Sequence, residues 1–275
     1  MLSQLPVKVI SLQRSGRRQR IAETLSTHCV DFDFVDAVDA NEIPTSDFDR
    51  LYDDAAARLR YGRSLSKGEV ACFVSHRRLW EAVAASEHGV IVLEDDALLD
   101  LAFFKKVVRW HGRKLSHFAD IVLLGRSKLS RSSGRRAYLY EPLKRSQPFD
   151  GMTIGLPFKQ WTSGSVGYWI SPRGAALALA HSVGPVRALL DDWPWHRDGG
   201  SLRIMELRPY VVWEGFESIA SDIEAERNPL ISGRTRWKDL LLEPLRFVRL
   251  VLRWSIATVI RVIAKFDTAA AVNHD

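Results

Sequence analysis

An apolar run that ends in three carboxylates constrains the fold of this chain more than any other feature. Val90–Leu93 is short and wholly apolar, which is typical of a buried strand, and Glu94-Asp95-Asp96 follows it directly. In open α/β sheets, ligands bind beyond the carboxyl ends of the strands. Adjacent carboxylates at such an edge repel one another and need a partner. The run therefore predicts a buried strand that delivers carboxylates to a ligand site.

Strands and helices are predicted to alternate along the chain. A capping box at Ser66–Glu69 opens a predicted helix that runs to about Ser86. The other predicted helices are 17–28 and 172–181, and the predicted strands are 7–12, 32–38, 90–93, 120–124 and 164–170. This alternation predicts an α/β fold with a mostly parallel central sheet flanked by helices. Residues 125–160 show no periodicity, so we expect an irregular segment there.

Composition excludes several classes of protein. With 46% hydrophobic and 26% charged residues, the chain is not expected to be disordered or fibrous. Cys29 and Cys72 are too few for a disulfide scaffold and indicate a reducing compartment. Residues 1–18 contain no apolar run before their charges, so we expect no secretory signal and a cytoplasmic protein.

The net charge of +6 is unevenly distributed. Residues 101–147 carry twelve basic and two acidic side chains, and the basic residues within 126–145 could either receive an anionic acceptor or form a solvated loop. The basic blocks lack the interleaved aromatic residues of a single-strand platform, so no nucleic acid is expected.

The tail 235–266 combines a long apolar stretch with seven basic and two acidic residues. Arginines near the middle of a membrane span would each cost about 2.5–3.5 kcal/mol. Arg246, Arg249, Arg253 and Arg261 recur at helical spacing, opposite apolar residues that include Leu250 and Trp254. We therefore expect an amphipathic helix lying on an anionic membrane surface. The alternative is a terminal helix packed on the domain.

The acidic triplet also predicts a metal site. If the strand pleat continues, Glu94 and Asp96 point to one side and Asp95 to the other. Oxygen ligands suit Mg²⁺ or Mn²⁺, with Asp96 as the first candidate ligand and Glu94 as the second. Such a metal could bridge the phosphates of a nucleotide-sugar or serve a phosphoesterase, and the spacing does not separate these two.

Several ordered segments resemble glycosyltransferase family 25, the lipopolysaccharide sugar transferases and their collagen-galactosyltransferase relatives. The segments, at 7–21, 34–40, 65–83, 90–99, 163–180 and 217–227, include VKVISLQRSGRRQRI, LSKGEVACFVSHRRLWEAV and VIVLEDDALL. The resemblance implies a GT-A-like nucleotide-diphospho-sugar fold, a UDP-sugar donor, often UDP-galactose, and a divalent metal. It also implies a glycan or lipid-linked glycan acceptor.

The resemblance further implies which residues bind the donor. The implied donor-binding residues are Ser11, Arg14, Arg18, Asp36, Asp39, Ser75, His76 and Asp95. Ala40 stands where the family has a glycine, so the turn after Asp39 is expected to differ from the family pattern. For His76, which shares a helical face with Phe73 and Trp80, a buried core role is the alternative. Cys72 is expected to be a small core residue.

The catalytic base is expected among two aspartates. Inversion at a sugar carbon needs a carboxylate that accepts the proton of the acceptor hydroxyl. Arg187 stands where the family pattern has an aspartate, and Asp191 or Asp192 is predicted to replace it, with Trp193 and Trp195 stacking on sugar rings. Alternatively, Asp191 caps the next element and Trp193 is part of the core. His196 is a further candidate metal ligand.

The sequence thus predicts a metal-dependent, inverting hexosyltransferase that uses a UDP-sugar and acts on an envelope glycan. A glycosyltransferase domain is expected over residues 1–233 and a basic amphipathic tail over 234–275, peripheral on the inner face of the cytoplasmic membrane. A metal-dependent phosphoesterase and a catalytically degenerate, membrane-associated glycan-binding protein are the alternatives.

Overall fold

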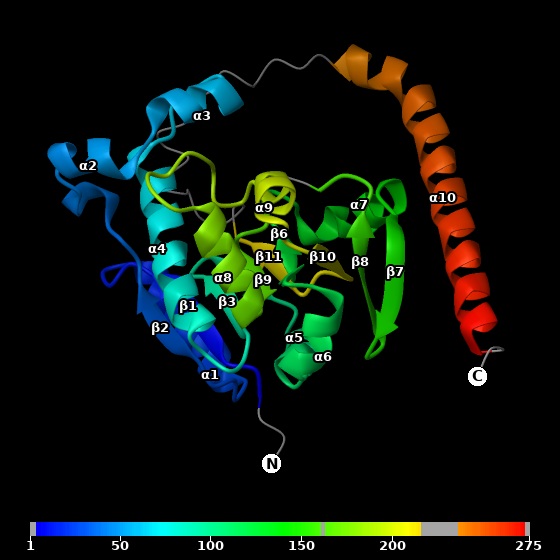
Figure 1. Cartoon of the computed structure of the whole chain (residues 1–275), viewed down its shortest axis with the longest axis horizontal. Coiled ribbons are helices and arrows are strands. Elements are labelled where there is room, and N and C mark those ends of the chain that lie inside the picture. Colours follow the sequence, from blue (N-terminus) through cyan, green and yellow to red (C-terminus); the bar gives the residue numbers. More distant parts are fainter. Residues whose placement is uncertain (1–3, 161–162, 216–235, 273–275) are drawn as a thin grey trace.

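The computed structural model describes residues 4–160, 163–215 and 236–272. Its centre is an eight-stranded sheet of order β2-β1-β3-β9-β5-β10-β8-β7 (Figure 1). The strands are β1 (Val7–Ser11), β2 (Asp33–Asp36), β3 (Val90–Glu94), β5 (Ile121–Leu123), β7 (Leu143–Phe149), β8 (Met152–Pro157), β9 (Gly167–Ile170) and β10 (Ile204–Arg208). A second sheet has the order β4-β11-β6, with β4 (Ala97–Leu99), β11 (Val212–Glu214) and β6 (Gly125–Arg126).

The large sheet is mixed, so the prediction of a mostly parallel sheet was wrong. Strand β1 pairs in parallel with β2 and β3, and β10 pairs in parallel with β5. Strand β9 is antiparallel to both of its neighbours, β3 and β5, and β8 is antiparallel to β7 and β10. The buried strands β3, β5 and β9 are short apolar runs, and such runs carry no signal for strand direction.

Helices cover both faces of the large sheet. Alternate strand residues pack into two hydrophobic clusters, with Ile91 and Leu93 in one and Val90 and Val92 in the other. Helices α1 (Gly16–Thr27), α5 (Leu101–Val108) and α6 (Gly112–Phe118) pack on the first cluster. Helices α4 (Lys67–Ala84), α8 (Pro172–His181) and α9 (Trp193–Gly200) pack on the second. The result is a three-layer α/β/α arrangement (Figure 1).

Local sequence signals explain where the principal helices begin. The predicted capping box is present: Ser66 accepts the Glu69 N–H, and the Glu69 side chain accepts the Ser66 N–H. Ser15 caps α1, and Ser171 caps α8 with Pro172 in the first turn. Smaller elements complete the described chain: η1 (Ala40–Glu42), α2 (Thr45–Leu51), α3 (Asp54–Tyr61), η2 (Arg131–Ser133) and α7 (Gly134–Tyr140).

The segment predicted to be irregular contains a helix and a hairpin. Residues 125–160 form β6, η2, α7 and the antiparallel pair β7–β8. Asp150 and Gly151 connect the two strands and have φ angles of 48° and 75°. These values fit the two-residue type I′ turn that Asp-Gly favours in hairpins. The turn was therefore encoded in the sequence although the strands around it lack a clean alternation.

The C-terminal helix α10 (Arg236–Val272) lies along the β7 edge of the molecule (Figure 1). Arg253 Nη1 donates to the Tyr140 carbonyl over 2.9 Å, and Trp254 Nε1 donates to the Leu139 carbonyl over 2.8 Å. Arginine and tryptophan thus share the face toward the domain, and their expected placement on opposite faces was wrong. Within the described ranges, no helix has an apolar stretch long enough to cross a bilayer.

Candidate functional site

Three parallel strands end side by side at the candidate site. In the register of the sheet, Ser11 pairs with Asp36 and Ile10 with Glu94, so the carboxyl ends of β1, β2 and β3 are adjacent. Strand β9 runs the other way, and its preceding residue, Val166, accepts the backbone N–H of Glu94 over 3.1 Å. Residues from four strands therefore meet at one edge of the sheet, as expected for a ligand site in an α/β fold.

Asp95 is anchored by groups from β1 and α1. The Ser11 hydroxyl donates to Asp95 Oδ2 over 2.8 Å, and Arg17 Nε lies 3.2 Å from Asp95 Oδ1. Asp95 and Ser11 are both buried. Arg17 was not singled out from the sequence, although it occupies the first turn of α1 beside Arg18. Positive charge at a helix N-terminus opposes the helix dipole, and this unusual placement is the sequence signal that could have drawn attention to Arg17.

Glu94 points toward α4, where it approaches His76. Glu94 Oε1 lies 3.6 Å from His76 Nε2, which is too long for a hydrogen bond. Burial raises the pKa of Glu94, but His76, Ser165 and Arg17 together lower it and leave this pKa below its usual value. The other ring nitrogen of His76, Nδ1, lies 2.7 Å from the Tyr168 hydroxyl, which fixes the orientation of the imidazole.

Asp96 shares the environment of Glu94. Burial, together with the charges of Glu94 and Glu214, raises the pKa of Asp96 to about 8. Asp95 contributes less than Glu94 to this shift, in agreement with the alternation that directs Glu94 and Asp96 to one side. Glu214 was missed in the sequence because nothing in the strand that it ends distinguishes it from other exposed glutamates. Its carboxylate also accepts the backbone N–H of Lys128 over 2.6 Å.

The residues at this edge fit a divalent cation. Three buried atoms, Glu94 Oε1, Asp96 Oδ1 and His76 Nε2, have no hydrogen-bond partner among the described residues. Potential ligand atoms of Cys72, His76 and Glu94 lie within 4.8 Å of one another. Unsatisfied buried carboxylate and imidazole atoms are costly unless an ion or ligand binds them. Glu94 and Asp96 offer oxygen ligands and His76 a nitrogen ligand, and the neighbouring Cys72 thiol would be a softer, sulfur ligand.

The remaining predicted donor-binding residues surround the ends of β1 and β2. Arg18 Nη1 donates to Asp36 Oδ1 over 2.7 Å and its guanidinium stacks on Phe34. Hydrogen bonds from Gln13 and Arg18 lower the pKa of Asp36. Three further predicted residues, which differ in their environments, are Ser75, Asp39 and Arg14. Ser75 accepts the Val38 N–H and so ties this loop to α4, Asp39 caps η1, and Arg14 is exposed in the turn after β1.

Asp191 and Asp192 have different surroundings. Asp192 is buried, caps α9 through the Trp195 N–H, and accepts hydrogen bonds from Arg60 and Tyr61 on α3. The charge of Asp191 acts on the Cys72 thiol together with those of Glu94 and Asp96. Asp191 therefore lies close enough to Cys72 for its charge to raise the pKa of that thiol, whereas the described contacts of Asp192 are those of a helix cap. The cap of α9 is Asp192 and not Asp191.

The aromatic residues after these aspartates form a buried cluster. Trp193 is fully buried and donates to the Ser163 carbonyl, so the expectation that it stacks on a sugar was wrong and its alternative core role holds. His196 is fully buried, and burial lowers its pKa to about 4. Phe73, Trp80, Trp193 and Trp195 surround the ring of His196, and the structure does not bring it to the acidic triplet. Arg187 is exposed and donates to the His181 carbonyl.

Comparison with known proteins identifies the family. Residues 4–186 match the family model described as glycosyltransferase family 25 (LPS biosynthesis protein), which covers more than half of the chain. The chain belongs to glycosyltransferase family 25. This confirms the resemblance inferred from the sequence. The family match includes the acidic triplet, His76 and the β1–α1 turn, whereas Asp191 and Asp192 lie beyond it.

Individual relatives in family 25 include active and inactive members. The chain is 30% identical over 226 residues to procollagen galactosyltransferase 1-B of Xenopus laevis, covering 73% of this chain and 34% of the relative. It is 28% identical over 178 residues to procollagen galactosyltransferase 1 of Danio rerio, covering 61% and 27%. It is also 36% identical over 133 residues to a probable inactive glycosyltransferase 25 family member 3 of Rattus norvegicus, covering 45% and 23%. The chain thus spans about a third or less of the length of these relatives.

Proposed function

We propose that the chain is a GT-A-like hexosyltransferase that moves galactose from a UDP-sugar donor to an envelope-glycan acceptor. The donor would bind at the carboxyl ends of the parallel strands. The observation that carries this proposal is that Glu94 Oε1, Asp96 Oδ1 and His76 Nε2 are buried without a hydrogen-bond partner among the described residues, with Glu94 Oε1 and His76 Nε2 3.6 Å apart. Membership of glycosyltransferase family 25, with galactosyltransferases among the relatives, supports the sugar-transfer chemistry. The family description supports a lipopolysaccharide-type acceptor.

Glu94, Asp96 and His76 would hold a Mn²⁺ or Mg²⁺ ion, with Cys72 close to it. Such an ion, when bound, supplies positive charge to the diphosphate that leaves with the nucleoside. Arg17 and Arg18 lie in the first turn of α1, where guanidinium groups can donate paired hydrogen bonds to phosphate oxygens. In the absence of donor, Asp95 and Asp36 hold these two arginines in place.

Asp191 is the carboxylate that we assign as the base that accepts the proton of the acceptor hydroxyl. In an inverting transfer, the acceptor oxygen forms a bond to the anomeric carbon while the bond from that carbon to the diphosphate oxygen breaks. The acceptor proton passes to a carboxylate. Asp191 is assigned this role because its charge acts at Cys72 together with those of Glu94 and Asp96, whereas Asp192 caps α9.

Calorimetric titration of UDP into the full chain, with and without Mn²⁺, tests the proposal. We expect Mn²⁺-dependent binding that Asp96→Asn weakens at least about tenfold, because one ligand charge is lost. Asp31→Asn is the matched control, since Asp31 is exposed and lies on the loop before β2. Absence of UDP binding to the folded wild-type chain under either condition would overturn the donor site.

A catalytically degenerate, glycan-binding protein is the second candidate. Two observations favour it: Arg187 stands where the family pattern has an aspartate, and some relatives are named inactive. This candidate predicts Mn²⁺-dependent UDP binding without release of UDP from any UDP-hexose in the presence of acceptor glycans. Turnover of UDP-galactose that Asp191→Asn removes would exclude it.

We also propose that α10 rests on the inner face of the cytoplasmic membrane. Ten of the fourteen exposed large apolar side chains among the described residues lie on this helix, from Leu245 to Ile263. An exposed apolar surface of this extent indicates a partner, and the net charge of +5 over residues 235–266 selects an anionic one. The free thiols of Cys29 and Cys72 are stable on the cytoplasmic side.

A further inference from the structure

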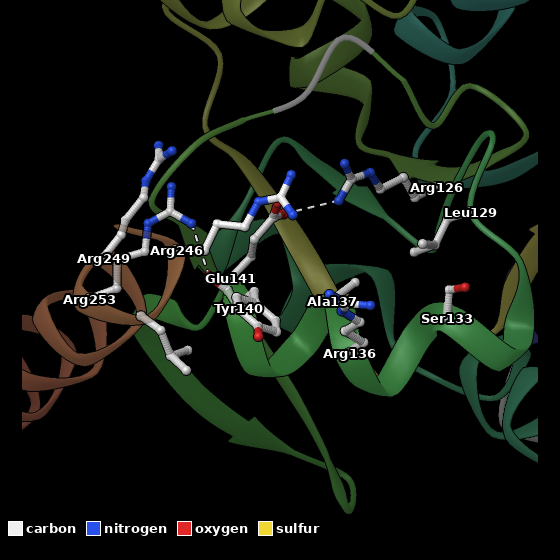
Figure 2. A pocket seen from close by; sticks show the side chains of 11 residues that line it. Arg126, Leu129, Ser133, Arg136, Ala137, Tyr140, Glu141, Arg246, Arg249 and Arg253 are labelled. Carbon is white, nitrogen blue, oxygen red and sulfur yellow. Dashed lines mark hydrogen bonds and ion pairs between the residues drawn. The ribbon is translucent and has the colours of Figure 1, made fainter. Parts of the chain in front are cut away.

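A cavity rich in arginine lies between α7 and α10, outside the acidic site (Figure 2). It has a volume of about 380 Å³. The side chains that line it come from β6 and the loop after it, η2, α7, the residue after α7, and α10. The charged ones are Arg126, Arg136, Arg246, Arg249, Arg253 and Glu141. Figure 2 shows the arginines of α10 on one side and Arg126 on the other, with Glu141 between them.

The charges that line this cavity are unbalanced. Five arginines face one glutamate, which gives the lining a net charge of +4. Glu141 Oε2 accepts a hydrogen bond from Arg126 over 3.0 Å, so the negative charge of Glu141 is partly neutralised by Arg126. Burial lowers the pKa of Arg253, and the charge of Arg249 lowers it further. Like charges held together on three elements are stabilised when an anion binds among them, and planar guanidinium groups match the oxygens of a phosphate.

The cavity lies near the acidic site but is separate from it. In the small sheet, Trp213 of β11 pairs with Leu98 of β4 on one side and with Arg126 of β6 on the other. Strands in a sheet are about 4.8 Å apart, so Arg126 lies roughly 10 Å across the sheet from Leu98, two residues after Asp96. Arg126, which lines the cavity, is therefore close to the strand that follows the acidic triplet.

We propose that this cavity binds a phosphate group carried by the acceptor. The inference rests on the proposed function and specifies its acceptor as a phosphorylated glycan or a glycan on a lipid phosphate. The apolar side chains of Leu129, Ala137 and Leu250 complete the lining and leave room for the organic part of such a ligand. One wall of the cavity is α10, whose opposite face is apolar and exposed.

Titration of inorganic pyrophosphate into the full chain, with a chelator to keep the acidic site free of metal, tests the proposal. We expect binding to the wild type that Arg136→Gln/Arg249→Gln weakens at least about tenfold, since both side chains are exposed and line the cavity. Arg109→Gln/Arg113→Gln removes the same charge from exposed positions at α5 and α6 and should bind as the wild type does. No binding to the wild type, or equal weakening in both variants, would overturn the proposal.

Two further measurements separate the possible outcomes. Displacement of bound pyrophosphate by phosphatidylcholine vesicles that contain phosphatidic acid would assign the phosphate to a lipid, and displacement by a soluble hexose phosphate would assign it to a free glycan. Displacement by neither would overturn the acceptor assignment. Mn²⁺-dependent UDP binding should be unchanged in Arg136→Gln/Arg249→Gln. If UDP binds and pyrophosphate does not, this inference alone fails; if the wild type does not bind UDP, the proposed function fails.

Discussion

Asp191 and Asp192 are adjacent in the chain, and substitution should separate their roles. Asp192→Asn places an amide NH₂ toward Arg60 and Tyr61, which both donate to the present carboxylate. We expect a loss of about 2–3 kcal/mol in the free energy of unfolding, measured by urea denaturation. Asp191→Asn should change stability by less than about 1 kcal/mol but remove sugar transfer. Equal loss of stability in the two variants, or full transfer activity in Asp191→Asn, would contradict this division.

His196 should make the fold sensitive to mild acid. Burial lowers its pKa from 6.5 to about 4, so the folded chain holds the neutral ring while the unfolded chain binds a proton below about pH 6.5. Stability should therefore fall as the pH drops from 6.5 toward 4, by up to about 3 kcal/mol from this residue. In His196→Gln, urea midpoints should depend less on pH over this range. His117→Gln, at an exposed position of α6, should retain the wild-type pH profile.

Much of the site could be predicted residue by residue, for identifiable reasons. Glu94 and Asp96 come at the end of an apolar run. Such a run predicts where a strand ends, and ligands in α/β folds bind beyond the carboxyl ends of strands. Arg17 and Glu214 could not be found in this way, because their places depend on side-chain direction and on a strand pairing distant in sequence. The family segment at 217–227 lies outside the described residues.

The β7–β8 hairpin depends on its turn, and this dependence can be measured. Gly151 has a φ of 75°, and no atom lies within 4 Å of an added Cβ, so Gly151→Ala would be strained by backbone conformation alone. We expect a loss of about 1–2 kcal/mol in the free energy of unfolding. Gly16→Ala, also without contacts within 4 Å and at the start of α1, should be neutral or stabilising. Equal effects in urea denaturation would show that the turn conformation is not the cause.

Strong local signals specified most elements on either side of this hairpin. The predicted strands and helices at 7–28, 66–93 and 164–181 are present, with caps at Ser66 and Ser171. What the sequence did not reveal is how strands far apart in the chain pair, because short apolar strands fit a parallel or an antiparallel neighbour equally well. The inserted β9, antiparallel on both sides, is the clearest example.

At the scale of the whole molecule, α10 connects the two proposed binding surfaces. Its inner stripe, which includes Arg253 and Arg261, donates hydrogen bonds to carbonyls at α7 and β7. Its outer face, which includes Val248 and Leu252, is apolar and exposed. A helix held to the domain by its arginines leaves its apolar face free for a membrane, so the domain and the acceptor phosphate would be brought to the same surface.

Vesicle co-sedimentation tests this arrangement directly. Val248 and Leu252 are 55% and 56% exposed, one helical turn apart. Val248→Gln/Leu252→Gln should lower partitioning onto phosphatidylcholine–phosphatidylglycerol vesicles at least tenfold, since burial of the two side chains in the bilayer interface contributes about 2 kcal/mol or more. Leu59→Gln/Val183→Gln changes two side chains that are 91% and 71% exposed on other elements and should leave partitioning unchanged. Because neither pair touches the acidic site, both variants should bind UDP as the wild type does. Equal partitioning of the two variants would exclude α10 as the membrane-binding helix and leave its apolar face to a protein partner.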